Sequence, residues 1–542
     1  MRSRLFTSLA LALAAQGCGT GEDLPFGNGG LSGGGDDDPC DEERSGDRRA
    51  GIMPGMCPGT STACTDPQAP IGCNVRPPAS PCTSPPGAAT VLEVCPACTY
   101  TTITAAVAAI ANPPTAETWV VVHAGTFTEN VTVSQAGTAA NPIKIAARCS
   151  GGSRDAVTVG FSTDNPVLKT TSTGTYVTFD GFKVNASAVA ATEGAVALVG
   201  NNGTAKYIVV DGATNQAGFY VEGTDCDFEE IDATDSKYGF QATFGDNLDL
   251  LRGAFCASLE NGMQLEGGIG HEITATLVQD SAVSGLLFDI EDDVVLKRVV
   301  SRGHTQSTGA GLELWDVTGI DVWHSQFVAN DHGLLVDLGA VDMVFENVLF
   351  ARNDRGITVS TGYTGSDLLN IRYSTFADGT YGVFTDADID LRLRRNIFHA
   401  GSVPGGFGVD VDTAGATVGE ELENLFSGYT TAANKCVDGG SGECSGVVWS
   451  SAEARMLGNG YYLEQAQSAG VDAASDNANT VTLGDGTDLE DLTTALDLVT
   501  DSQEADLGFH HLPCNETLGD EGCGDGNCSG TETSGSCPED CP

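Results

Sequence analysis

The sequence is poor in basic residues: its 542 residues include 25 Lys and Arg against 74 Asp and Glu, and the formal net charge is -49. Nucleic acid is therefore not expected as a partner, because phosphate binding requires a basic surface. Long hydrophobic runs are also scarce, and after the first residues none is long enough to span a bilayer. The 70 glycines and the hydrophobic fraction of 41% fit a turn-rich, all-β protein with enough apolar residues for a long core.

The sequence also lacks helical patterns between its strand-like runs. Instead, a glycine followed by an apolar, a variable and an apolar residue recurs with steps of 21, 23, 23, 26, 22, 23, 26 and 26 residues. A period of about 23 residues predicts a solenoid. A right-handed parallel β-helix fits best, because leucine-rich repeats need a fixed Leu/Asn pattern and propeller blades need about twice this length. The repeat glycines are Gly218, Gly239, Gly262, Gly285, Gly311, Gly333, Gly356, Gly382 and Gly408.

The beginning of the chain has the charged, apolar and small-residue parts of a secretory signal, and these parts end at Cys18. The residues Ala15-Gln16-Gly17-Cys18 resemble the lipobox of bacterial lipoproteins, which implies cleavage before Cys18 and lipidation of its thiol. An ordinary signal peptide followed by a chance cysteine is the alternative. We expect an extracellular, cell-surface protein, which would be an outer-membrane lipoprotein if the organism is a Gram-negative bacterium.

Five segments are expected along the chain. They are a signal peptide at 1–17, a Cys-containing tether rich in Gly, Pro and Asp at 18–89, the parallel β-helix at 90–415, a C-terminal cap of the β-helix at 416–512 and a Cys-rich tail at 513–542.

An exported chain is expected to hold most of its 18 cysteines in disulfides. Lipidation of Cys18 would leave 17, and an odd number requires at least one thiol that is unpaired or shared with another chain. The candidates for local disulfides are Cys436, Cys444, Cys523, Cys528, Cys537 and Cys541. Acidic residues of the tail could instead bind Ca²⁺, but their spacing is not that of an EF-hand.

The start of the expected solenoid has a distinctive order of elements. A short amphipathic helix at 103–110 precedes strands at 119–123 and 129–133 and the segment Gly137-Thr138-Ala139-Ala140-Asn141-Pro142-Ile143. This order resembles the opening of the pectin-lyase-like β-helix superfamily, in which the helix caps the first turn. The resemblance implies a fold and no single activity, because the superfamily contains lyases, hydrolases, esterases, epimerases and surface proteins with no known reaction. Residues 455–511 resemble the closing segment of bacterial surface β-helix proteins, which packs on the last turns.

The position four residues after each repeat glycine is expected to point outward, and it is acidic in six of nine repeats. Equivalent residues of successive turns stack about 4.8 Å apart, so adjacent carboxylates repel each other. One interpretation is a Ca²⁺-binding groove, and the other is a solvated acidic face that keeps the protein soluble. The column is Glu222, Thr243, Glu266, Asp289, Trp315, Asp337, Ser360, Asp386 and Asp412, and its candidate Ca²⁺ ligands are Glu266, Asp289, Asp337 and Asp386.

No stretch of the sequence matches an active site of the superfamily residue by residue. Arg372 and Arg394 are candidate bases if the chain is a Ca²⁺-dependent polysaccharide lyase. The aromatic residues that could stack on a sugar ring are Trp315, Trp323, Tyr363 and Tyr381. The sequence therefore favours a lipid-anchored surface module that binds or adheres to an extracellular polysaccharide, with the lyase as the alternative and a purely structural role as a third possibility.

Overall fold

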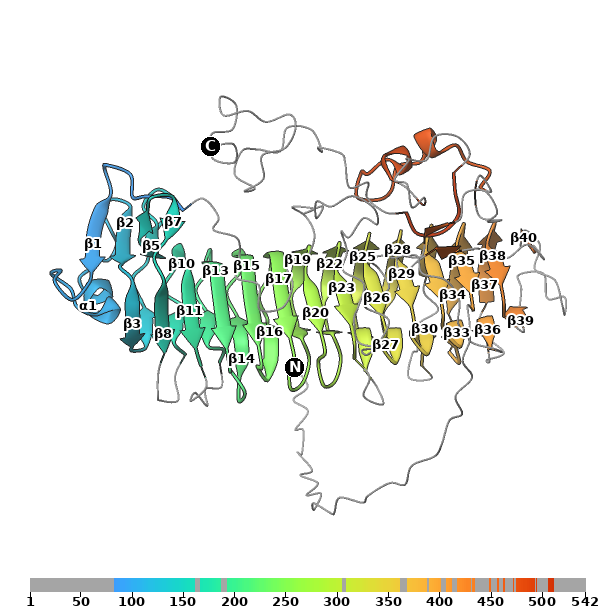
Figure 1. The fold of residues 1–542 in the computed structure, drawn as a ribbon, viewed down its shortest axis with the longest axis horizontal. Coiled ribbons are helices and arrows are strands. Elements are labelled where there is room, and N and C mark those ends of the chain that lie inside the picture. The colour runs from blue at the N-terminus through green and yellow to red at the C-terminus, as the bar shows by residue number, and fades with distance from the viewer. Residues whose placement is uncertain are drawn as a thin grey trace, which may run out of the picture. The chain divides into compact units, whose positions relative to one another are not determined.

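A computed structural model describes residues 82–510 of the chain, except 161–165, 187–192, 305–308, 361–367, 388, 401–405, 412–416, 430, 434–447, 450–455, 458–461, 464–470, 472–473, 493 and 495–504. The described residues belong to one compact unit, which runs from Gly51 to Pro542. They form a β-solenoid of about 12 turns (Figure 1). None of the helices in the described part is long and apolar enough to cross a membrane.

One wall of the solenoid is a sheet of 13 described strands, which we call sheet B. Its strands are β4 (Val131–Val133), β9 (Leu168–Thr170), β12 (Val196–Leu198), β14 (Ala217–Val221), β16 (Tyr238–Thr243), β18 (Met263–Glu266), β21 (Leu286–Asp289), β24 (Ala310–Trp315), β27 (His332–Leu338), β30 (Arg355–Val359), β33 (Tyr381–Thr385), β36 (Phe407–Val411) and β39 (Thr431–Ala433). Every pairing in sheet B is parallel, and the register aligns Phe219, Phe240, Met263, Leu286 and Leu312 on one wall of the core.

The remaining walls form a sheet of 25 described strands, which we call sheet A. Its strands are β1 (Thr90–Val94), β2 (Thr118–Val122), β3 (Gly125–Thr128), β5 (Ile143–Ala147), β8 (Val157–Gly160), β10 (Val177–Asp180), β11 (Phe182–Asn185), β13 (Thr204–Asp211), β15 (Cys226–Thr234), β17 (Leu248–Cys256), β19 (Ile269–Thr274), β20 (Leu277–Gln279), β22 (Asp292–Lys297), β23 (Val300–Arg302), β25 (Thr318–Trp323), β26 (Gln326–Val328), β28 (Val341–Glu346), β29 (Leu349–Ala351), β31 (Leu368–Arg372), β32 (Thr375–Ala377), β34 (Asp390–Arg394), β35 (Ile397–His399), β37 (Thr417–Leu422), β38 (Leu425–Ser427) and β40 (Val448–Trp449). Short antiparallel pairs join β6 (Cys149–Ser150) to β7 (Ser153–Arg154) and β41 (Met456–Leu457) to β42 (Tyr462–Leu463).

In each turn, a sharp corner divides the part of the chain in sheet A into two strands. The strands before the corner, for example β22, β25 and β28, form the first arm of the sheet, and the strands after it, for example β23, β26 and β29, form the second arm. One residue with positive φ occupies this corner in each turn, and in the later turns the corner residues are Arg298, His324, Asn347, Tyr373 and Arg395. Their φ values of 49° to 57° lie in the left-handed region, which allows the chain to change direction over a single residue. The residue that follows a corner often forms a hydrogen bond with the equivalent residue of the next turn. For example, the Val348 backbone N–H donates to Ser374 Oγ at 3.1 Å.

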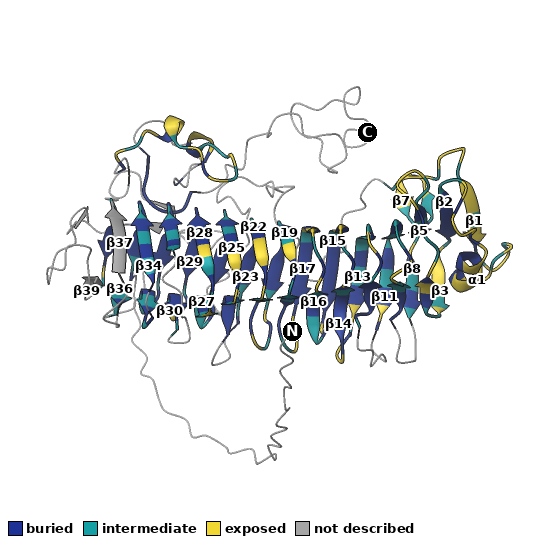
Figure 2. Cartoon of the chain, turned by 180° about the vertical axis from the view of Figure 1, so that it is seen from behind, coloured by how far each residue is buried: buried dark blue, intermediate teal, exposed yellow. Residues whose placement is uncertain are grey.

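The interior is a continuous stack of apolar side chains, which confirms the parallel β-helix expected from the repeat. Phe350, Phe376, Phe398 and Phe426 stack ring on ring, with centroids 4.9, 4.6 and 4.6 Å apart and interplanar angles of 7° or less. These separations match the spacing of adjacent strands in a sheet. Residues a full turn apart in sequence are therefore vertical neighbours. Figure 2 shows the strands of successive turns side by side, with much of their length buried.

The helix α1 (Ile103–Ala108) forms where the sequence predicts it, although it ends before residue 110. Its side chains Ile103, Ala106 and Val107 are buried in the main core. The Glu129 carboxylate accepts hydrogen bonds from the backbone N–H groups of Ile103 and Thr104, each at 2.8 Å. Figure 1 shows α1 beside β1 and β3, and its role as a cap of the first turn stays a prediction.

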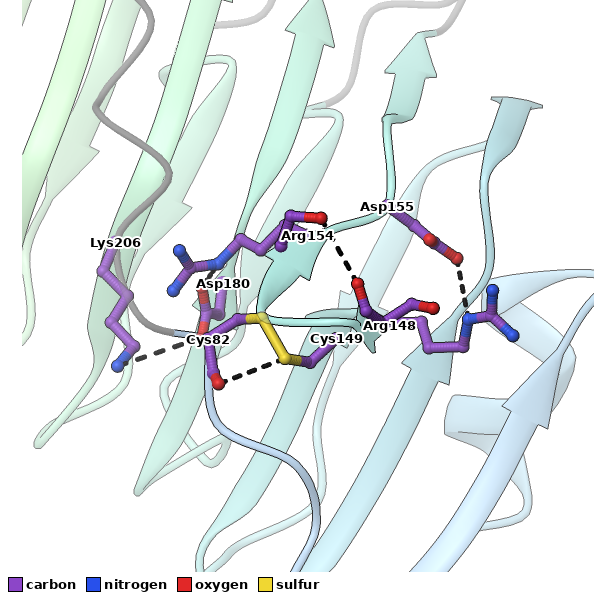
Figure 3. The surroundings of a disulfide bond; sticks show 9 residues. Cys82, Arg148, Cys149, Arg154, Asp155, Asp180 and Lys206 are labelled. Atoms are coloured by element: carbon purple, nitrogen blue, oxygen red, sulfur yellow. Dashed lines mark hydrogen bonds and ion pairs between the residues drawn. A yellow bond between two sulfur atoms is a disulfide. The ribbon is translucent and has the colours of Figure 1, made fainter. Parts of the chain in front are cut away.

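Two disulfides join described cysteines near the start of the solenoid. Cys82, which falls in the expected tether, is bonded to Cys149 of β6 (Figure 3), and Cys95 is bonded to Cys98. The last residues expected to form the tether are therefore attached to the solenoid. Cys226 is buried and unpaired.

Solenoid strands continue beyond residue 415, where the boundary between the solenoid and its C-terminal cap is expected. Strands β37, β38 and β40 pair in parallel with the turns before them. After these strands, the described parts of 471–510, which we call the flank segment, include the short 3₁₀ helices η2 (Ala478–Thr480) and η3 (Leu489–Asp491). The flank segment packs on the side of the late turns, where Leu483, Leu489 and Leu507 form a cluster with Tyr373, Ile397 and Leu425.

Candidate functional site

The outer face of sheet B carries two columns of prominent side chains over its late turns. The first column consists of the residues that precede the repeat glycines, and the register aligns Ala310, His332, Arg355, Tyr381 and Phe407. The second column lies two residues after those glycines and contains Glu313, Leu335, Thr358, Phe384 and Asp410. Large side chains that lie side by side on an outer face form a ready-made contact surface.

Four of these side chains form a cluster that we call the aromatic platform: Arg355, Tyr381, Phe384 and Phe407. The rings of Tyr381 and Phe407 are parallel within 6°, with centroids 6.0 Å apart. Phe384 meets Tyr381 edge to face at 5.6 Å. The Arg355 guanidinium carbon lies 4.4 Å from the Phe384 centroid and 5.4 Å from the Tyr381 centroid. All four side chains are half-buried, so part of each remains open to solvent.

The Arg355 side chain has unused hydrogen-bonding capacity. Its Nε is buried without a hydrogen bond, and within the described part of the chain it forms no ion pair. Its cation–π contacts contribute about 0.5–1 kcal/mol at a partly exposed site and do not use its N–H groups as hydrogen-bond donors. The neighbouring His332 carries little positive charge at neutral pH, because burial lowers the pKa of His332 and the Asp331 carboxylate only partly opposes this effect.

Glu313 holds the indole of Trp315 on the same face. Glu313 Oε1 accepts from the Trp315 Nε1–H at 3.0 Å, and Oε2 accepts from the Ser284 hydroxyl at 2.6 Å. Burial raises the pKa of Glu313, while the two hydrogen bonds oppose this effect and the charge of Asp337 adds to it. Trp315 is therefore a fixed, half-buried aromatic residue on the platform side of the solenoid.

The predicted acidic column forms only in part. The register places Thr243, Glu266, Asp289 and Trp315 in line. Beyond Trp315 an irregularity shifts the register, so that Leu338 and not Asp337 is opposite Trp315. Asp337 is instead held by the Ser360 hydroxyl of the next turn, and the Asp386 N–H donates to Val359 O at 3.3 Å.

Glu266 and Asp289 remain direct neighbours on β18 and β21. Burial raises the pKa of Asp289, and the negative charges of Glu266, Asp316 and Glu291 raise it further. Their oxygens are of the hard type that Ca²⁺ prefers, but only two of the four candidate ligands are adjacent.

The candidate bases lie on sheet A, away from the outer face of sheet B. Arg372 and Arg394 are aligned in register at the ends of β31 and β34. Arg372 Nε donates to Glu346 Oε1 at 2.5 Å, and Glu346 Oε2 accepts from the Gly484 N–H of the flank segment at 2.7 Å. The structure therefore does not place these arginines in one groove with the acidic column.

The candidate aromatic residues also lie on different sheets. Tyr381 and Trp315 are on the outer face of sheet B, whereas Trp323 is on β25 of sheet A. A Cβ added at Gly484 of the flank segment would lie 3.0 Å from Trp323 Nε1, so this indole packs against the flank segment. Tyr363, the lipidation candidate Cys18 and the disulfide candidates Cys436, Cys444, Cys523, Cys528, Cys537 and Cys541 lie outside the described residues.

A hollow on sheet A offers a second, polar surface of about 370 Å³. Its acidic lining residues are Asp225, Asp227 and Asp249, next to Asn202 and Asn247. Burial raises the pKa of Asp227, and the charge of Asp249 raises it further. Asp225 already accepts a hydrogen bond from the Asn247 amide at 2.9 Å.

The sequence reasoning did not bring Arg355, Phe384 and Phe407 together with Tyr381, because it aligned only the column four residues after the glycine and considered the aromatic and basic candidates one by one. The column before the glycine changes from small or polar residues at Ala217 and Ser284 to Arg355, Tyr381 and Phe407 in the late repeats. This accumulation of aromatic residues in one column is a signal that the sequence does contain.

No model of a known protein family matches the sequence, and no curated protein matches it. Several solved structures do. The A-module of the mannuronan C-5 epimerase AlgE4 of Azotobacter vinelandii matches with 12% identity and a TM-score of 0.41, over 62% of this chain and 91% of that chain. The PL6 family alginate lyase AlyGC matches with 11% identity and a TM-score of 0.40, over 64% and 54%. The catalytic domain of a GH87 α-1,3-glucanase matches with 10% identity and a TM-score of 0.38, over 69% and 71%.

These similarities concern the fold. The assignment rests on the chain's own strand register, in which both large sheets are parallel and successive turns stack residue on residue. The chain is a parallel β-helix protein.

Proposed function

We propose that this chain is an exported, surface-attached module that binds an extracellular glycan, and that the aromatic platform is its binding site. The observation that carries the proposal is the pair of parallel rings, Tyr381 and Phe407, which are half-buried on consecutive turns of a rigid sheet. Flat aromatic faces suit the apolar faces of pyranose rings, and a repeating solenoid presents them at intervals along an extended chain.

Arg355 adds polar recognition to this surface. Its uncommitted N–H groups can donate to sugar hydroxyl or carboxylate oxygens beside the rings, while its contacts with Phe384 and Tyr381 fix its position. Sites built on strands are more precise than sites on loops, because the packed core holds their backbone. Attachment through a lipidated Cys18 would place the solenoid at a cell surface, where such polymers are found.

The lyase alternative has weaker support from the geometry. A base on this fold must face the sugar beside a group that neutralises its charge. Arg372 is instead bonded to Glu346 beneath the flank segment, and the acidic column is on the other sheet. Ultraviolet absorbance of unsaturated products from uronic acid polymers, with and without Ca²⁺, would detect a lyase directly.

The proposal is tested with the full-length protein on a glycan array, followed by titration of the best ligand. Tyr381→Ala should weaken binding by about thirty-fold, since the loss of a central aromatic contact costs about 2 kcal/mol. Phe244→Ala is the matched control, because Phe244 is 72% exposed on a different part of the chain. Unchanged affinity in Tyr381→Ala, or an array with no bound glycan, would reject the proposal.

A further inference from the structure

The disulfide between Cys95 and Cys98 closes a tight turn directly after β1. In this turn the Cys98 N–H donates to Cys95 O at 3.1 Å. Pro96 occupies the second position, where its fixed φ suits a turn of this kind. The turn brings the Cα atoms of the two cysteines to 4.9 Å from each other, and their sulfur atoms are bonded. The result is a Cys-x-x-Cys disulfide at the N-terminal end of the described solenoid.

This disulfide contributes little to the stability of the fold. A cross-link restricts the unfolded chain more strongly when it closes a longer loop. The separation is three residues between Cys95 and Cys98, but 67 residues between Cys82 and Cys149. The backbone also closes the same turn, because the Cys95 N–H donates to Tyr100 O at 3.1 Å. A chemical role therefore suits this pair better than a role as a cross-link.

The Cys-x-x-Cys disulfide is accessible from solvent. Among the described strands, β1 pairs only with β2, so it forms the edge of sheet A at this end. Cys95 and Cys98 are half-buried, and the two residues between them, Pro96 and Ala97, are exposed. Exposed disulfides are the ones that an external thiolate attacks and exchanges with.

A glutamate and a histidine lie beside the sulfur of Cys98. Val94 and Val122 are aligned in the register of β1 and β2, and both are buried in the main core. Glu93 precedes the first valine and His123 follows the second, so both side chains face outward. Cys98 Sγ lies 3.9 Å from Glu93 Oε2, and His123 Nε2 lies 3.7 Å from the same oxygen. A ring nitrogen of His123, a carboxylate oxygen of Glu93 and Cys98 Sγ all lie within 4.8 Å of one another.

The imidazole of His123 is available to transfer a proton. Within the described part of the chain, its Nε2 is buried and forms no hydrogen bond. The register places Arg148 at the equivalent position of the next turn, after β5. Arg148 Nε is already paired with Asp155 Oδ2 at 2.8 Å (Figure 3). The charged groups around the imidazole are therefore Glu93, which is next to the sulfur, and this ion pair.

We propose that Cys95 and Cys98 form a redox-active disulfide, which oxidises the paired thiols of a peptide or protein, and that His123 transfers the protons of this reaction. Cys98 is the leaving sulfur, because the histidine lies beside it. This site is on sheet A at the first turn, and its activity is independent of the proposed glycan site.

The reaction consists of two thiol–disulfide exchanges. A substrate thiolate attacks Cys95 Sγ, the S–S bond breaks, and Cys98 leaves as a thiolate that takes a proton from His123. The second substrate thiol gives its proton to the neutral His123 and attacks the substrate sulfur that is bonded to Cys95. The substrate departs as a disulfide, and the Cys95 thiolate takes a proton from water. Two electrons thus pass from the substrate thiols to the protein, and a small-molecule disulfide restores the oxidised state.

The full-length oxidised protein is tested with a synthetic peptide that carries two cysteines, followed by alkylation and mass spectrometry. Cleavage after glutamate isolates Cys95 and Cys98 in peptide 94–117 and Cys149 in peptide 130–193. The synthetic peptide should become oxidised while Cys95 and Cys98 become alkylated and Cys149 does not. The double variant Cys95→Ser, Cys98→Ser should leave the synthetic peptide reduced. A synthetic peptide that stays reduced with the wild type, or that the double variant oxidises equally well, would overturn the proposal.

The pH dependence of the oxidation rate tests the role of His123. At pH 7, His123→Ala should react about a hundredfold more slowly than the wild type, at the lower end of what a positioned acid or base contributes. At pH 9 the two rates should be equal, because histidine side chains are then neutral and donate no proton. Thr99→Ala, at an exposed position of the same loop, is the control and should match the wild type at both pH values. Equal rates of His123→Ala and the wild type at pH 7 would reject this role. Neither assay depends on glycan binding, so their failure would leave the proposed function intact.

Discussion

The attachment of the flank segment depends on one buried carboxylate, and its removal is the most informative perturbation of the fold. Asp485 Oδ2 lies 2.8 Å from Lys297 Nζ and 3.2 Å from His324 Nε2, and its side chain is 1% exposed. His324 Nδ1 lies 2.8 Å from the Asn347 amide nitrogen and accepts from it, so the ring carries its proton on Nε2 and donates that proton to Asp485. Burial lowers the pKa of His324, which agrees with a neutral ring.

Asp485→Asn keeps the shape of this side chain and removes its charge. Hydrogen bonds to charged groups contribute about 1.5–3 kcal/mol, so we expect the flank segment to be destabilised by about 2 kcal/mol. Because the flank segment opens locally, hydrogen exchange at the Leu483 and Gly486 amides should accelerate by about thirty-fold while the core strands stay unchanged.

Asp476→Asn is the matched control on the same segment. Asp476 also forms an ion pair, with Arg395 Nη2 at 2.8 Å, but its side chain is 41% exposed. Exposed pairs contribute about 0–1 kcal/mol, so the control should accelerate exchange by less than about five-fold. Equal exchange in Asp485→Asn and the wild type would refute the role given to the buried carboxylate.

Three further predictions concern pH, the turn spacing and the acidic column. Burial alone would raise the pKa of Asp485, but hydrogen bonds from His324, Lys297 and the Thr487 N–H outweigh it and hold this pKa well below its usual range, so the stabilising effect of Asp485 is complete above about pH 4 and is lost progressively as the pH falls below that. Pulsed hydrogen exchange should therefore show the flank segment opening below about pH 4 in the wild type and much less pH dependence in Asp485→Asn. Gly356→Ala should lower the unfolding midpoint, because the new Cβ would lie 2.5 Å from the Gly382 carbonyl oxygen, whereas Gly87→Ala, with no atom within 4 Å, should have no effect in the same denaturant titration. Burial and the charge of Glu266 raise the pKa of Asp289, which means that its charged form destabilises the folded protein. Asp289→Asn should therefore raise the unfolding midpoint at pH 7 in EDTA. If the substitution instead lowers the midpoint only when Ca²⁺ is present, the predicted metal site is supported.

The repeat was readable from the sequence because the solenoid imposes the same requirement on every turn. A Cβ added at Gly333, Gly356 or Gly382 would lie within 2.5 Å of the carbonyl oxygen of the next repeat glycine, so no other residue fits without a shift. The inward residues after these glycines must be apolar for the same geometric reason. Period, strand positions and core face were therefore predicted together.

The site was less predictable, because the outer face is free to vary from turn to turn. The irregularity after Trp315 moved Asp337 out of the column, and no residue type in the sequence announces that shift. The packing of the flank segment on the solenoid was equally unpredictable from the sequence. Its buried contacts, such as that of Asp485 with Lys297, join residues far apart in sequence that no repeat relates.

The central claim is that the outer face of sheet B binds a glycan through the aromatic platform. A structure of the full chain with the best array oligosaccharide tests it most directly. The account predicts a pyranose ring stacked on Tyr381 and Phe407, with a hydrogen bond from the Arg355 guanidinium. An oligosaccharide bound elsewhere, for example in the hollow lined by Asp225, Asp227 and Asp249, with the platform empty, would contradict it.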